Sequence, residues 1–96
     1  MPEVMSDAAV DTKLAELPGW QRSGATLRKT WQLKGFLTAM TFANAVAHVA
    51  QQLDHHPDLT VHDYNQLTLV TTTHSAGGIT ENDVWLAQAV EGLGSV

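Results

Sequence analysis

The sequence contains no cysteine, which excludes disulfides, thiolate zinc sites and cysteine nucleophiles. Basic residues are also scarce, because five Lys and Arg stand against ten Asp and Glu and leave a formal net charge of −5. Binding to nucleic acid or to an anionic membrane surface needs clustered positive charge. We therefore expect neither nucleic acid nor a membrane as a direct partner.

Long apolar runs are missing as well. No stretch approaches the roughly 18 consecutive apolar residues that indicate a membrane-spanning helix. The chain starts with MPEVMSDAAVD, which is acidic and lacks the positive charge and apolar run of a secretory signal. These features predict a cytosolic protein, and the 96 residues are enough for a single domain over residues 1–96.

Histidine is what the chain has in abundance. Four of its five histidines lie within residues 51–83, and two of them, His55 and His56, are adjacent and followed by Pro57. Proline disfavours helical geometry in the residue before it, so the pair is expected where a helix ends. Histidine is the side chain whose unperturbed pKa lies nearest neutrality, so this grouping is typical of acid and base chemistry.

Apolar spacing predicts three helices. The clearest covers residues 37–53, where Phe42, Val46, Val49 and Leu53 recur at steps of four and three. A first helix is expected over residues 6–17. A last helix follows Thr80, with Asp83 three residues on in a capping-box-like arrangement, and ends near residue 91 or 92.

Two hairpins are expected between these helices, over residues 20–33 and 59–73. In the second, a two-residue turn would place Leu59 and Leu69 on opposite faces of the sheet. A three-residue loop at residues 63–65, or a bulge, would give a common apolar face and is preferred. The order α-β-β-α-β-β-α predicts an α+β fold with a four-stranded antiparallel sheet covered by helices.

The predicted elements can bring distant polar residues to one rim of the sheet. His74 ends the last expected strand, His55 and His56 end the main helix, and Asp83 opens the final helix. A carboxylate at Asp83 could orient an imidazole. A helix cap is the simpler interpretation of Asp83, and spacing alone favours it.

Together these residues resemble the pterin-4a-carbinolamine dehydratase family. The family pattern is a paired His-His followed by Pro, an aromatic residue six or seven positions later, a His ten further on and a downstream Asp. The matching residues are His55, His56, Pro57, Tyr64, His74 and Asp83, and the run THSAGGITEND is similar to bacterial members. The expected order of elements also matches the family fold over almost the whole chain.

The resemblance implies removal of water from a 4a-hydroxytetrahydropterin during cofactor recycling after aromatic amino acid hydroxylation. A proton must reach the leaving hydroxyl and another must leave the neighbouring ring nitrogen, and histidine can do either. By resemblance His55, His56 and His74 are the catalytic candidates, with His56, Gln51 and Asp83 as substrate-binding candidates. Which imidazole is acid and which is base stays open. The resemblance implies no metal or organic cofactor. It does imply a homodimer or a homotetramer.

Two positions depart from the family pattern. Gln51 stands where members usually carry a charged residue, often Glu, and its carboxamide can hydrogen-bond a histidine but cannot stabilise an imidazolium as a carboxylate would. Leu59 stands where animal members have tryptophan, so aromatic packing against the pterin is absent or supplied elsewhere. Both departures bear on rate and affinity.

Two other functions stay open. A metal-binding protein could use the many imidazoles with Asp54 and Asp58, although no His-x-His or His-x3-His spacing occurs. A non-catalytic interaction module is the second, because animal family members also bind a transcription factor through helical surfaces.

The remaining aromatic and histidine residues have structural interpretations. We expect His48 and His62 to be exposed to solvent. The three tryptophans are expected in the core or in subunit contacts rather than at a ligand site, because large aromatic side chains are usually buried: Trp20, Trp31 and Trp85.

Overall fold

The computed structural model describes residues 3–94. The elements follow the predicted order, which confirms the α+β fold with a four-stranded antiparallel sheet. They are α1 (Asp7–Leu14), β1 (Gln21–Ser23), β2 (Thr26–Gln32), α2 (Phe36–Leu53), β3 (Asp58–His62), β4 (Gln66–Thr71) and α3 (Glu81–Glu91). Within the described residues, none of the helices has the length and apolar character needed to cross a membrane.

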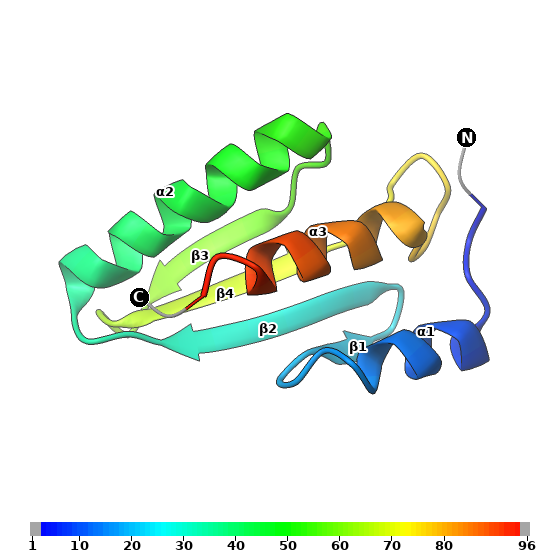
Figure 1. Ribbon diagram of the computed structural model, residues 1–96, viewed down its shortest axis with the longest axis horizontal. Helices are drawn as coiled ribbons and strands as arrows, with labels where there is room; N and C mark the ends of the chain where they lie inside the picture. Colours follow the sequence, from blue (N-terminus) through cyan, green and yellow to red (C-terminus); the bar gives the residue numbers. More distant parts are fainter. Residues whose placement is uncertain (1–2, 95–96) are drawn as a thin grey trace.

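The strands lie in the order β1-β2-β4-β3, and every neighbouring pair is antiparallel. Figure 1 shows α2 and α3 across one face of this sheet, with α1 beside β1 at its edge. The core lies between the sheet and the two helices, and its buried side chains include Leu27, Leu67, Leu69, Phe42, Val46, Leu86 and Val90. The order of strands places β3 and β4 side by side under α2, so the segments that enter β3 and leave β4 lie at one end of the sheet.

The second hairpin has a three-residue loop, which is one of the two connections that the sequence favoured. Leu59 pairs with Leu69 and Val61 pairs with Leu67, so the apolar residues of β3 and β4 share the face that the helices cover. The loop between the strands is residues 63–65, and two of its residues take positive φ angles. The alternation of apolar residues therefore determined the register correctly.

The first helix is shorter than predicted. It ends at Leu14, and the chain continues in tight turns in which the N–H of Leu17 donates to the carbonyl of Leu14 at 3.0 Å. This bond joins residues three apart instead of four apart, a geometry that is common where a helix ends. Pro18 follows at once and cannot continue a helix.

The tryptophan prediction is confirmed for the two residues in the sheet region and wrong for Trp85 as a core residue. Trp20 is buried, and its ring meets the half-buried Trp31 edge to face with centroids 5.7 Å apart. Trp85 is 52 % exposed. It lies between the inward-facing Val84 and Leu86 of α3, so helical spacing turns it away from the sheet.

Candidate active site

The C-terminus of α2 determines where the paired histidines lie. α2 ends at Leu53, and Asp54 adopts the left-handed conformation with φ 53°. The backbone N–H of His55 then donates to the carbonyl of Ala50 at 3.1 Å, a bond typical of helix C-terminal caps. The predicted helix end is confirmed, and it fixes the backbone that carries both histidines.

Asp83 lies in the first turn of α3 and has no exposed surface. Its Oδ2 accepts a hydrogen bond from the backbone N–H of Thr80 at 2.9 Å, and together the two residues form the predicted capping box. The capping role is therefore confirmed.

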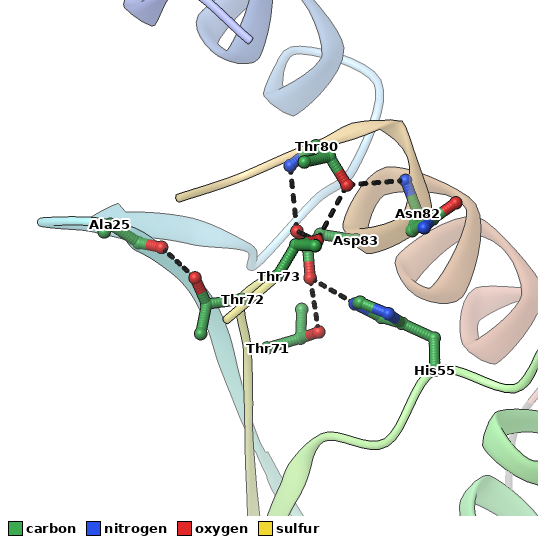
Figure 2. A network of polar contacts seen from close by, with 8 residues as sticks. All are labelled: Ala25, His55, Thr71, Thr72, Thr73, Thr80, Asn82 and Asp83. Carbon is green, nitrogen blue, oxygen red and sulfur yellow. Dashed lines mark hydrogen bonds and ion pairs between the residues drawn. The ribbon is translucent and has the colours of Figure 1, made fainter. Parts of the chain in front are cut away.

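Asp83 also accepts hydrogen bonds from other parts of the chain (Figure 2). The hydroxyl of Thr71 donates to Oδ1 at 2.7 Å, and the hydroxyl of Thr73 donates to Oδ2 at 2.8 Å. The Nε2 of His55 lies 2.6 Å from Oδ1. Burying a carboxylate is costly unless it is hydrogen-bonded, and here both oxygens have donors from several elements. Asp83 is thus a helix cap and a histidine partner at once.

The buried carboxylate determines how His55 holds its proton. An ionised carboxylate only accepts hydrogen bonds, so the Nε2 that faces it must carry hydrogen. Nδ1 is then the nitrogen left to exchange a proton with a ligand. The His55 side chain is 12 % exposed, which leaves it a narrow contact with the surface. An imidazole with one nitrogen anchored and the other available is suited to proton transfer.

His56 is exposed and meets Gln51 rather than an acid. Its Nε2 lies 3.0 Å from Oε1 of Gln51, one turn back on α2. The carboxamide at position 51 therefore hydrogen-bonds a histidine, as the sequence predicted. The uncharged Gln51 orients the ring of His56 without offering it a counter-charge.

His74 is exposed and lies in the turn that joins Thr73 to Gly78. Its side chain makes no hydrogen bond to another residue in the described range 3–94. Its neighbour Thr73, however, binds the same carboxylate as His55. Asp83 therefore bonds both His55 and the residue that precedes His74. Within residues 3–94, no hydrogen bond joins the imidazoles of His55, His56 and His74 to one another.

Sequence reasoning missed Thr71 and Thr73. Both are buried, and they follow Leu67 and Leu69 at alternate positions, so they face the helices from β4 and the segment just beyond it. Two polar residues that continue an inward-facing apolar alternation need a buried partner. That pattern was the signal that could have identified them.

The other two histidines lie away from Asp83. His48 is exposed on α2, as predicted. His62 was predicted to be simply exposed, and this is wrong, because its ring bonds Asp63 at 2.8 Å and Thr68 at 2.6 Å and its side chain is only 33 % exposed. Pairing with a neighbouring strand residue accounts for the partial burial.

The metal-binding alternative requires several ligand side chains close together. Across the described residues 3–94, no three His, Cys, Asp or Glu side chains gather closely enough to hold a metal ion. The alternative therefore has no ligand cluster to support it in this part of the chain.

Comparison with known proteins shows the family of this chain. Residues 3–93 match the family model described as pterin 4 alpha carbinolamine dehydratase. The chain belongs to this family. A candidate pterin-4-alpha-carbinolamine dehydratase of Thermomicrobium roseum is 46 % identical over 91 residues, which cover 95 % of this chain and 97 % of the relative. Another, from Thermosynechococcus vestitus, is 41 % identical over the full length of both chains.

Solved structures share the pterin-4-alpha-carbinolamine dehydratase fold. A Brucella melitensis protein described as a transcriptional coactivator/pterin dehydratase superposes with a TM-score of 0.89 at 28 % identity, covering 97 % of this chain and 100 % of that one. A pterin dehydratase-like RuBisCO assembly factor of the alpha-carboxysome has a TM-score of 0.61 at 19 % identity, covering 80 % of this chain and 89 % of that one. The second likeness concerns the fold alone.

Proposed function

We propose that the protein dehydrates a 4a-hydroxytetrahydropterin to the quinonoid dihydropterin and water by histidine acid and base catalysis, in tetrahydropterin recycling. Membership of the family supports the reaction class. The observation that carries the chemistry is the 2.6 Å contact between His55 and the fully buried Asp83. A cytosolic location, catalysis by a single domain and independence from any metal or organic cofactor are part of the same proposal.

The reaction needs two proton movements and no change in net charge. The C4a–O bond breaks as the hydroxyl takes a proton and leaves as water. The ring nitrogen next to C4a gives up its proton, and a C=N bond forms between that nitrogen and C4a. His55 and His74 are the proposed pair for these steps, because each can give or take a proton near neutral pH.

Asp83 acts through His55 in this proposal. The resemblance made Asp83 a substrate-binding candidate, and its lack of exposed surface supports the proposal that it acts on His55 instead. Its role is to keep the proton of His55 on Nε2 and to hold the ring still, as acids behind a functional histidine do. His56, held by Gln51, is proposed to bind and orient the pterin.

A matched set of variants tests the activity. The native chain should accelerate dehydration of a 4a-hydroxytetrahydropterin over buffer, and His55→Ala and His74→Ala should each lower kcat by roughly a hundredfold or more. His48→Ala is the control, because His48 is an exposed histidine on α2 and should leave the rate unchanged. A native chain without acceleration, or two active-site variants with full activity, would contradict the proposal.

Self-association is a further part of the proposal. Phe36, Leu37 and Met40 are 58 %, 77 % and 39 % exposed near the start of α2, and exposed apolar groups of this kind favour protein contacts. A homodimer or homotetramer would bury them, and light scattering after size exclusion should report a mass above that of the monomer. The same surface would serve the alternative of a non-catalytic interaction module. An active enzyme that stays monomeric would contradict the proposed self-association.

A further inference from the structure

A hollow of about 260 Å³ adjoins His55 between the end of α2 and the start of α3. Its lining consists of Gln52, Leu53, His55, Asn82 and Trp85. The imidazole that Asp83 holds therefore forms part of the wall of this hollow. Another hollow, of about 410 Å³, is lined by Lys29, Trp31 and Glu91 among others and contains none of the site histidines.

Two apolar side chains are left uncovered in this hollow. Trp85 is 52 % exposed and Leu53 is 43 % exposed. An indole carries more apolar surface than most side chains and usually gains by being covered. Trp85 lies between the buried Val84 and Leu86, so the exposed indole is not needed to fill the core.

The chemistry of the lining matches a flat, neutral heterocycle. The indole of Trp85 offers a face for stacking. Gln52 and Asn82 each provide a carboxamide with both donors and an acceptor, which can pair with the amide edge of a pyrimidinone ring. The volume lies just below the roughly 300 to 1,000 Å³ typical of sites for drug-sized ligands, so it fits a smaller, bicyclic molecule.

We propose that Trp85 is the wall on which the pterin ring stacks, with Gln52 and Asn82 at the amide edge of the ring. The proposal rests on the dehydratase function and adds to it a residue that determines affinity. It also gives a source for the aromatic packing that Leu59 cannot supply. In this arrangement the ring lies beside His55, whose Nδ1 is the nitrogen left to exchange a proton.

The test uses the full chain and 7,8-dihydropterin, which lacks the 4a-hydroxyl and so cannot be dehydrated. Calorimetry should show that Trp85→Ala weakens binding roughly tenfold or more, as loss of an aromatic stacking partner does, and that Trp85→Phe keeps most of the affinity. In the dehydration assay KM should rise by a similar factor in Trp85→Ala while kcat stays within about twofold. Gln88→Ala is the control, because Gln88 is exposed on α3 and does not line the hollow.

Fluorescence supplies a readout that a structural role of Trp85 would not change. Bound dihydropterin should quench the native emission, and Trp85→Phe should lose most of this quenching while keeping its affinity. This variant decides the matter even if Trp85→Ala folds poorly in circular dichroism. Quenching as strong in Trp85→Phe as in the native chain would overturn the proposal.

The remaining outcomes separate the proposal from the function on which it rests. Native affinity and native KM in a folded Trp85→Ala, with an active native enzyme, would overturn the stacking role and leave the dehydratase function standing. A native chain that neither binds dihydropterin nor accelerates dehydration would overturn both.

Discussion

Within residues 3–94, two histidine–aspartate pairs have similar contact distances and opposite surroundings. His55 meets Asp83 at 2.6 Å, and His62 meets Asp63 at 2.8 Å. The carboxylate of Asp83 is fully buried, whereas the side chain of Asp63 is 74 % exposed. Water screens the second pair, so its interaction is worth little. The distance between two groups therefore does not by itself identify a functional pair.

The hydrogen bonds around each carboxylate extend this difference. Asp83 also accepts from Thr71, Thr73 and the backbone of Thr80, and these bonds fix its position before any ligand arrives. In the exposed pair the threonine bonds the other ring nitrogen, since Thr68 lies 2.6 Å from Nε2 of His62. His62 thus has both nitrogens occupied, while His55 keeps Nδ1 free of the carboxylate.

Removal of the carboxylates should give the largest contrast. Asp83→Asn replaces one of the two acceptor oxygens with an NH₂ group, which cannot accept the hydrogen bonds that the carboxylate receives. This variant should lower the free energy of unfolding by roughly 3 kcal/mol. Asp63→Asn should change it by no more than about 0.5 kcal/mol, as surface substitutions usually do. Urea denaturation of both variants and the native chain measures the difference. Equal losses would mean that burial does not distinguish the two pairs.

Removal of a threonine hydroxyl should give a smaller contrast of the same sign. Thr73→Val keeps the shape of the side chain but deletes its hydrogen bonds to the buried carboxylate of Asp83 and to the hydroxyl of Thr80. Loss of the bond to the carboxylate alone should cost about 1.5 to 3 kcal/mol. Thr68→Val on the open face of the sheet should cost less than about 1 kcal/mol. Thr73→Ser should recover most of the lost stability. A serine variant as unstable as the valine variant would point to lost packing instead of a lost bond.

Replacement of Gln51 should have the smallest effect. Gln51→Glu places a carboxylate beside the exposed His56, where solvent weakens the interaction, so unfolding free energy should change by less than about 0.5 kcal/mol. The catalytic effect should also stay within about tenfold and be seen mainly in KM, because His56 is proposed to bind substrate. Steady-state kinetics of the two chains measures this. A change in kcat alone would indicate that His56 takes part in proton transfer and not in substrate binding.

Local signals in the sequence predicted much of the fold. The end of α2 before Pro57, the three-residue loop of the second hairpin and the capping box of Thr80 and Asp83 each depend on residues close together in the chain. The end of α1 was misplaced, because the apolar edge of that helix extends into the turns that follow it.

The environment of the site could be predicted only in part. Spacing placed Asp83 at a helix start, but its partners come from β4, the segment beyond it and the end of α2, and their approach depends on packing of the whole domain. Exposure of Trp85 was missed for a different reason, since the general tendency of large aromatic side chains to be buried was given more weight than the helical spacing of Val84 and Leu86. The partners of His62 likewise depend on how β3 pairs with β4.

A double-mutant cycle on the buried pair tests the central claim, that Asp83 acts in catalysis through His55. The measurement is kcat for dehydration in the native chain, His55→Ala, Asp83→Asn and the combined variant, each shown to be folded under the assay conditions. We expect Asp83→Asn to lower kcat in the native background and to have almost no further effect once His55 is replaced. Losses that multiply in the combined variant would show that the two residues act independently, and would contradict the account.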